Sequence, residues 1–457
     1  MTRHTVAFIH LGCAKNLVDA EIMGGHLEAG GWDVSDEVAK ADVVIINTCG
    51  FIQEAKEESL SEIFAFLEDQ TKRPAHDQQG LVVAGCLTQR YQKALHQEIP
   101  EIDGLLGVND LDEVTRVVDA VLRGNQVVAV SQEAPSDCTP ARRRRRQTPE
   151  HYAYVKIAEG CSRGCGYCAI PLIRGPFRSQ DPTVIFDEVQ TLVSQGVREI
   201  NLIAQDVTRY GADLDGWSFE LLLERLARAF SDTWFRCLYA YPSGVSRQLV
   251  RVLAKYDNVC PYLDLPLQHV SPSILTRMGR NEDPKKVRAL LGHLRREVPN
   301  MSIRSTFMVG FPGETEADFE QLIRFLQEEP LDHVGVFAYS REEGTPAYSL
   351  SDPIPETIKR ERQRRLQKVA MEVALIAKRP LVGQTLPVLL DQRSDEGWLG
   401  RHQGQAPEVD GNVLVADVGA KSVGDRVFVR ITGVDAWDLW GRACRPTESN
   451  REDTLGA

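Results

Sequence analysis

The chain has 457 residues, 42% hydrophobic and 26% charged, which is typical of a globular protein with about two to four domains. Its formal net charge of −12 disfavours a protein that binds mainly to phosphate backbone, and it is compatible with a basic partner. No apolar run approaches the ~18 residues of a membrane span, and the start lacks a signal peptide, so we expect a cytoplasmic chain without a membrane partner.

Residues 1–125 are expected to form a parallel-sheet α/β domain. Apolar runs at 6–10, 43–47 and 81–85 have the composition of buried parallel strands, and amphipathic stretches separate them. A cysteine follows each run: Cys13, Cys49 and Cys86, called the first trio below. Any one of them alone would more often be a packing residue. Because the carboxyl ends of parallel strands line one ligand-binding edge, we expect the three thiols to converge on one site.

The segment 126–150 is rich in Pro, Ser and Arg, has no periodicity, and is predicted to be a linker. Its run Arg142–Arg146 fits a nucleic-acid patch or, as we favour, a solvated hinge that charge repulsion extends.

Residues 151–380 repeat the strand–helix alternation on a larger scale. We expect strands at 154–158, 199–206, 234–241, 262–269, 303–311 and 333–340, with a long charged helix at 355–379. Six such units with right-handed crossovers predict a partial (β/α)6 barrel. Active-site residues are then expected at the carboxyl ends of its strands.

Three further cysteines follow the first of these strands with the spacing C-x3-C-x2-C: Cys161, Cys165 and Cys168, called the barrel trio below. In a reducing compartment, clustered thiols indicate a metal site or catalysis more often than disulfides. Structural zinc takes four ligands, whereas three thiolates leave one coordination position open. We therefore favour a 4Fe–4S cluster with one open iron over a zinc site completed by a distant residue.

Residues 381–447 contain short apolar runs between glycine-rich turns, which predicts a small antiparallel β-barrel, and 448–457 form a tail. Between Pro387 and Asp425 there are three basic residues against seven acidic ones, a balance of −4. An acidic face suits a basic protein better than RNA, although counting alone leaves an ordinary solvated surface open. The acids that we expected to dock such a partner are Asp391, Asp395, Glu396, Glu408 and Asp410.

The cysteine loop of the barrel resembles the signature of the radical S-adenosylmethionine enzymes. In that superfamily the open iron binds the amino and carboxylate groups of S-adenosylmethionine, and one electron from the cluster cleaves the cofactor to give a radical. The resemblance implies that Tyr167, just before Cys168, packs near the cofactor, with simple packing as the alternative.

The sequence "FMVGFPGE" is the best candidate for the rest of the cofactor pocket. Gly310 and Gly313 would allow the backbone to approach a ligand at a strand end. Glu314 could accept a hydrogen bond from the cofactor or cap the next helix. Gln268 and His269 end the fourth barrel strand and should face the site, with a satisfied core histidine as the alternative for His269.

Taken together, the three modules resemble the methylthiotransferases, in which the C-terminal module is a TRAM domain. The stretches "LGCAKNLVDAE", "IAQDVTRYG", "GVFAYSREEGTPA" and "WDLWGR" resemble the RimO-type branch. That resemblance implies β-methylthiolation of an aspartate in small-subunit ribosomal protein twelve, with two 4Fe–4S clusters. One molecule of S-adenosylmethionine would donate methyl, and another would be cleaved.

The same resemblance implies an electron donor such as flavodoxin and a sulfur donor, but it assigns no catalytic residue beyond the clusters. The sequence leaves open which sulfur donor and reductant serve the reaction, and whether the chain is a monomer. The alternatives are a MiaB-type methylthiotransferase acting on isopentenyladenosine in tRNA, and an iron–sulfur electron carrier or RNA-binding scaffold without catalysis.

Overall fold

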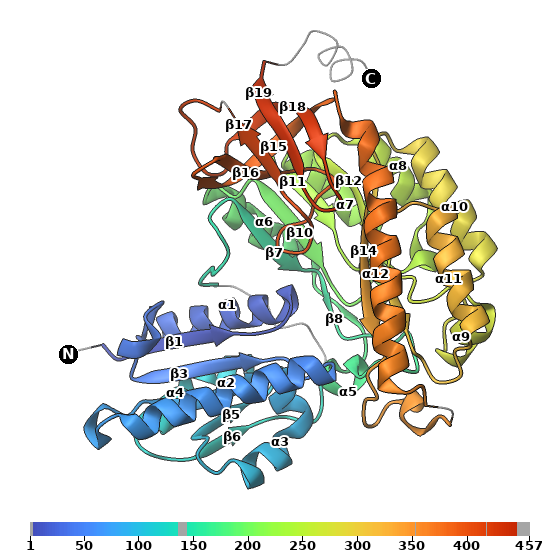
Figure 1. The fold of residues 1–457 in the computed structure, drawn as a ribbon. Coiled ribbons are helices and arrows are strands. Elements are labelled where there is room, and N and C mark those ends of the chain that lie inside the picture. Colours follow the sequence, from blue (N-terminus) through green and yellow to red (C-terminus); the bar gives the residue numbers. More distant parts are fainter. Residues whose placement is uncertain (1–2, 136–143, 352, 417, 446–457) are drawn as a thin grey trace.

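The computed structural model describes residues 3–135, 144–351, 353–416 and 418–445, which form three domains in chain order (Figure 1). The first domain and the C-terminal barrel lie at opposite ends of the central domain (Figure 1). No helix in these ranges combines the length and the apolar character that crossing a membrane requires.

The first domain is a parallel sheet of six strands in the order β2-β1-β3-β4-β5-β6. Val43 and Ile45 pack in a core with residues of α1 and α4, whereas Val44 and Ile46 pack with residues of α2 and α3. Successive side chains of a strand point to opposite faces, so helices on both faces require the continuous apolar runs seen in the sequence. The elements are β1 Thr5–His10, α1 Ala14–Ala29, β2 Asp33–Ser35, β3 Val43–Thr48, α2 Gln53–Lys72, β4 Gly80–Gly85, α3 Cys86–Glu98, β5 Gly104–Leu106, α4 Val114–Leu122 and β6 Val127–Ala129.

The central domain contains six parallel strands in the order β14-β13-β12-β11-β10-β7, with a small antiparallel pair β8-β9 beside them. Chain order and sheet order coincide, which confirms the predicted partial (β/α)6 barrel. The elements are β7 Tyr152–Lys156, β8 Ala158–Glu159, α5 Ile170–Arg174, β9 Arg178–Ser179, α6 Pro182–Ser194, β10 Glu199–Ile203, α7 Phe219–Ala229, β11 Trp234–Cys237, α8 Arg247–Lys255, β12 Val259–Asp264, α9 Pro272–Arg277, α10 Pro284–Glu297, β13 Ser302–Val309, α11 Glu316–Glu328, β14 His333–Ala338 and α12 Glu356–Lys378.

The third domain is a closed barrel of five strands in the order β15-β16-β17-β19-β18. Its strands alternate buried and exposed residues, as in β18, where Val427, Val429 and Ile431 fill the interior. The prediction of an antiparallel barrel is wrong in one detail, because β17 and β19 pair in parallel to close it. The elements are β15 Thr385–Ser394, β16 Gly397–His402, β17 Val413–Ala416, β18 Arg426–Val434 and β19 Leu439–Cys444.

This small barrel is seated on the amino ends of the central strands. Arg401 contacts Glu199, the first residue of β10, at 2.6 Å, and the carbonyl of Gly404 accepts hydrogen bonds from Ser302 and His333, the first residues of β13 and β14. The carboxyl ends of the central strands therefore remain available to the cysteine loop and to the first domain.

Candidate functional site

The barrel trio lies in the loop that joins β8 to α5, at the carboxyl end of the first central strand. Hydrogen bonds from Cys161 N to Gly175 O (3.1 Å), from Gly166 N to Met278 O (2.8 Å) and from Ala347 N to Gly166 O (2.7 Å) hold this loop in place. Gly160 precedes it with φ +75°, and a Cβ there would lie 2.1 Å from Pro176 O, so this position accepts only glycine.

The thiols of the barrel trio are half-buried. Burial raises the pKa of Cys161 and raises that of Cys168 to about 12, to which the other thiols of the trio add. Such thiols remain protonated at neutral pH until a metal centre replaces the proton, so loading of this site should release protons.

The first trio occupies the carboxyl edge of the first sheet, as the chain pattern predicts. Cys13 follows β1 and precedes α1, Cys49 follows β3, and Cys86 is the first residue of α3. Gly12 has φ +95°, and a Cβ on it would be 3.0 Å from the Cys49 Cβ, so glycine allows the first two loops to meet. Burial raises the pKa of Cys86 to about 12, and its neighbours Cys49 and Cys13 add to the shift.

In the described residues, no three His, Cys, Asp or Glu side chains lie close enough to hold a single metal ion. A cubane cluster instead places each thiolate on a different iron, so six cysteines in two groups of three fit two such clusters.

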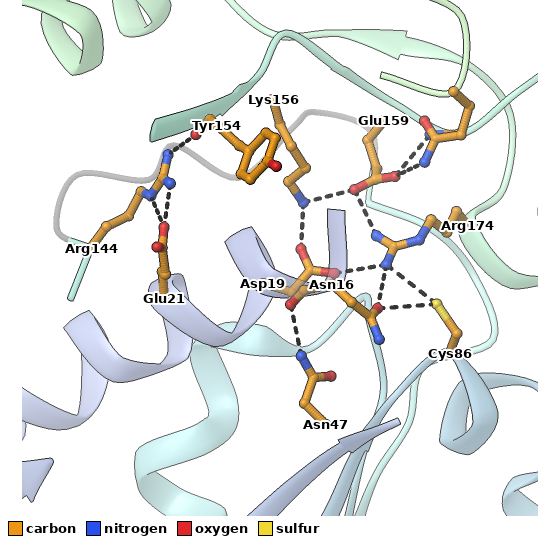
Figure 2. A network of polar contacts seen from close by, with 12 residues as sticks. Asn16, Asp19, Glu21, Asn47, Cys86, Arg144, Tyr154, Lys156, Glu159 and Arg174 are labelled. Carbon is orange, nitrogen blue, oxygen red and sulfur yellow. Dashed lines mark hydrogen bonds and ion pairs between the residues drawn. The ribbon is translucent and has the colours of Figure 1, made fainter. Parts of the chain in front are cut away.

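The two trios approach each other across the interface between the first and central domains. Cys86 packs against Ala169 and Ile173, which belong to the segment directly after Cys168. Arg174 ends that segment, and its Nη2 lies 3.3 Å from Cys86 Sγ and 2.8 Å from Asp19 Oδ2 (Figure 2).

Lys156 and Glu159 of the central domain complete this buried network. Lys156 Nζ lies 2.5 Å from Asp19 Oδ1 and 2.8 Å from Glu159 Oε2, and Arg174 Nη1 lies 3.0 Å from Glu159 Oε2 (Figure 2). The cations Arg174 and Lys156 hold the pKa of Glu159 far below its usual range, against the effect of burial. The interface is thus fixed by alternating charges directly beside both groups of cysteines.

A second polar contact lies between Cys13 and the barrel strands. Lys15 Nζ is 3.3 Å from the ring centroid of Tyr239, which follows β11 with a left-handed φ of +63°. The nearby cations Lys15 and Arg174 lower the pKa of Cys13, although desolvation by the surrounding chain acts in the opposite direction. Left-handed φ at a bulky residue is uncommon and concentrates at functional sites.

Two of the residues that we associated with the cofactor lie close to the cysteine loop or to a strand end. Tyr167 packs with Ile274 and Phe311, and its hydroxyl accepts a hydrogen bond of 3.2 Å from Arg280. Gln268 has a left-handed φ of +68°, and its backbone bridges β12 to β13 through Thr306 O and Met308 N.

The remaining pocket candidates are occupied by contacts within the chain. Glu314 is 2% exposed and accepts hydrogen bonds from Gly310 N and Phe311 N, and it pairs with Arg362 at 3.1 Å. It therefore braces its own loop, and Thr315, rather than Glu314, caps α11. A Cβ on Gly310 would lie 2.3 Å from Lys359, and one on Gly313 would lie 2.6 Å from Arg277. The space left free at these two glycines is therefore taken by side chains of this chain.

His269 is buried, as the alternative of a core histidine supposed. Its Nδ1 accepts a hydrogen bond of 2.9 Å from Ser271 N, while Nε2 has no hydrogen-bond partner among the described residues. Burial lowers the pKa of His269 to about 4, so the ring is neutral at physiological pH. Outside the two trios, Cys237 and Cys260 are buried beside their strands, where they act as packing residues. Cys138 lies outside the described residues.

Sequence reasoning missed the polar residues that join the domains. Lys15, Asn16, Asp19 and Glu21 are all buried on α1, although the helical pattern there was considered only for its apolar residues. The available signal was that several polar and charged residues follow Cys13 closely without forming one polar face of the helix. Arg174 and Tyr239 gave no such signal because their partners Asp19 and Lys15 belong to the first domain.

The run of arginines is neither a nucleic-acid patch nor a solvated hinge where it is described. Arg144 is buried between Glu21 of α1 and Glu188 of α6, and Arg145 pairs with Glu28 at 2.9 Å. These arginines pair with carboxylates that lie far away in the sequence. The local sequence pattern therefore could not predict the pairs. Arg142 and Arg143 lie outside the described residues.

The acidic balance of the C-terminal barrel is largely neutralised within the chain. Asp391 contacts His151 and Arg401, Asp410 contacts Arg304 at 2.6 Å, and Glu408 accepts from Tyr152 and Tyr154. The expectation that Asp391 and Asp410 dock a partner is wrong, because ion pairs within the chain already engage them. Glu408 is exposed, so for this residue the expectation stays a prediction. Asp395 and Glu396 remain exposed between β15 and β16.

Three family models match the three domains. Residues 5–107 match the uncharacterized protein family UPF0004, residues 155–326 the radical SAM superfamily, and residues 382–444 the TRAM domain. Among solved structures, the radical S-adenosylmethionine methyltransferase TsrM from Kitasatospora setae has a TM-score of 0.56 at 15% identity, over 76% of this chain and 74% of that one. At that identity the likeness supports the fold alone.

Curated relatives match nearly the whole chain. A protein of Desulforudis audaxviator is 44% identical over 96% of both chains, one of Syntrophotalea carbinolica is 43% identical over 96% of both, and one of Geobacter sulfurreducens is 41% identical over 96% of this chain and 98% of the relative. All three are named ribosomal protein uS12 methylthiotransferase RimO. With both cysteine trios, the radical SAM barrel and the TRAM domain in place, the chain belongs to the RimO family of methylthiotransferases.

Proposed function

We propose that this protein attaches a methylthio group to the β-carbon of an aspartate in ribosomal protein uS12. The observation that carries the proposal is the placement of two groups of three cysteines on facing edges of two domains, joined by the buried contact of Arg174 with Cys86. The names of the curated relatives, at up to 44% identity, point to uS12 as the substrate rather than to tRNA.

The donor sets fit the groups that this reaction needs. Two 4Fe–4S clusters would be held by the first trio and the barrel trio, and S-adenosylmethionine would lie at the barrel trio near Tyr167 and Gln268. When bound, these groups supply the electron for cleavage of S-adenosylmethionine and carry the sulfur to be transferred.

The residues of the chain contribute orientation and exclusion of water. The loop of the barrel trio is fixed through Gly166 and Met278, and Arg280 holds the hydroxyl of Tyr167. The cations Lys15 and Arg174 lie beside the first trio, where they offset the negative charge of thiolates bound to iron. Both are less than 10% exposed, so water screens their charges little.

We also propose that the protein works in the cytoplasm, where uS12 is available, with an external electron donor such as flavodoxin and a separate sulfur donor. The family membership supports this setting. We assign cofactor contacts to Tyr167 and Gln268, whereas Gly310 and Gly313 make room for Lys359 and Arg277 of this chain. Glu314 has an indirect role, because it holds the backbone at Gly310 and Phe311 in place.

The proposal is tested by mapping the product. Reconstituted protein, S-adenosylmethionine, reductant and sulfide are incubated with uS12, which is then digested and analysed by tandem mass spectrometry. The expected product is one peptide in which a methylthio group replaces a hydrogen of an aspartate side chain. A methylated peptide without added sulfur would contradict a methylthio transfer.

A further inference from the structure

We propose that Arg174 is a positioning residue for the first trio: it donates a hydrogen bond to the sulfur of Cys86 and raises the reduction potential of the cluster bound there. This inference rests on the proposed function, because it requires an iron–sulfur cluster at the first trio. It goes further in assigning control of that cluster to a residue of the other domain.

The contact is made across the domain interface. Arg174 belongs to α5, six residues after Cys168, yet its Nη2 lies 3.3 Å from Cys86 Sγ in the first domain. The same nitrogen lies 2.8 Å from Asp19 Oδ2 and 2.9 Å from Asn16 Oδ1, which fix the guanidinium in this orientation (Figure 2). In the free thiol, Cys86 Sγ also donates a hydrogen bond of 3.3 Å to Asn16 Oδ1. A thiolate bound to iron has no proton to donate, so the hydrogen bond from Arg174 is the one that remains.

This environment distinguishes Cys86 from the other cluster cysteines. Among the hydrogen bonds between described residues, the one from Arg174 is the sole one that a cationic side chain donates to any of the six thiols. The guanidinium is 2% exposed and Cys86 is 6% exposed, so water and salt screen the interaction little.

The direction of the effect follows from electrostatics. A reduced cluster carries one more electron than an oxidised one, so a cation that touches a ligand sulfur stabilises the reduced form. Hydrogen bonds to cluster sulfurs are among the main determinants of these potentials. The carboxylates of Asp19 and Glu159 oppose Arg174, but each is also bound by Lys156, at 2.5 Å and 2.8 Å, which leaves the cation at the sulfur as the closest charge.

Potentiometric titration of the holoenzyme, followed by electron paramagnetic resonance, tests the proposal without substrate. The wave of the first cluster is identified by its absence when the first trio is replaced with alanine. In Arg174→Gln we expect the ratio of oxidised to reduced first cluster at a fixed potential to rise at least tenfold, a downward shift of about 59 mV for one electron. Arg174→Lys should keep the reduction potential of the first cluster close to its wild-type value. The reduction potential of the barrel cluster should be unchanged in both variants.

Arg144→Gln is the matched control, because Arg144 is buried in the same interface with Glu21 and Glu188 but donates no hydrogen bond to a thiol. The proposal would be overturned if the reduction potential of the first cluster were unchanged in Arg174→Gln, or if it shifted equally in Arg144→Gln. Should Arg174→Gln fail to fold, Asp19→Asn gives the opposite test, since loss of the opposing charge must raise the potential. An unchanged or lower potential in Asp19→Asn also overturns the proposal.

The two proposals fail in different ways. Protein that binds a single cluster, at the barrel trio, would refute the proposed function and this inference together. This inference alone would be refuted if the protein bound both clusters and modified uS12, but the reduction potential of the first cluster did not depend on Arg174.

Discussion

Replacing Arg401 with methionine should loosen the C-terminal barrel from the central domain. Arg401 is 2% exposed, lies 2.6 Å from Glu199 Oε2, and binds both oxygens of Asp391 at 2.8 Å. Removing one partner of a buried ion pair typically costs about 3–5 kcal/mol, because the remaining charge is left without a counter-charge. Here Glu199 keeps Arg236 and Asp391 keeps His151, so we expect the lower end, about 3 kcal/mol.

At about 2–4 °C per kcal/mol for domains of this size, the first unfolding transition should move down by about 6–12 °C. Differential scanning calorimetry measures the transition, and limited proteolysis shows whether residues after α12 are cleaved first. The control is Arg430→Met at an exposed position of β18, which should change stability by less than about 0.5 kcal/mol. An Arg401→Met protein that unfolds at the wild-type temperature would refute the assignment of this contact as the anchor of the barrel.

Three further predictions follow from the site and the surface. Alanine at the whole barrel trio should leave the iron of one cluster and abolish cleavage of S-adenosylmethionine, whereas alanine at the whole first trio should spare cleavage and stop methylthio transfer; loss of all iron in either protein would contradict two separate sites. Because the pKa of His269 falls from 6.5 unfolded to about 4 folded, its contribution to stability is complete above pH 6.5 and is lost as the pH falls toward 4, by about 1.4 kcal/mol per unit. Chemical denaturation of His269→Gln at several pH values in this range should show that its free energy of unfolding depends less steeply on pH than that of the wild type. An identical dependence on pH in both proteins would count against a buried neutral ring. Reversing the charges of Asp395 and Glu396 should weaken binding of uS12 at low salt, with the difference fading as salt screens charges over ~10 Å, and equal binding at low salt would exclude electrostatic docking there.

Strands and cysteine positions could be predicted because their signals are local. The runs before Cys13, Cys49 and Cys86 are apolar for several residues, so each strand and the edge on which its cysteine lies follow from the chain alone. The short strands β2, β5 and β6 were missed, since three residues are too few to show a pattern, and β6 lies in the segment predicted as a linker.

Interactions between domains could not be predicted in the same way. The acids of the C-terminal barrel were taken for a docking face, yet Asp410 is buried against Arg304, more than a hundred positions earlier. Arg144 was expected to be solvated, but it is buried between the carboxylates of Glu21 on α1 and Glu188 on α6. Charge counting reports how many ions a segment carries, whereas their partners depend on how domains pack.

The most direct test of the account compares the two substrates of the methylthiotransferases. Reconstituted protein is incubated with S-adenosylmethionine, reductant and sulfide, together with either uS12 or tRNA that carries isopentenyladenosine, and both products are analysed by mass spectrometry. We expect a methylthio group on uS12 and unmodified tRNA. Methylthiolated tRNA with unmodified uS12 would contradict it.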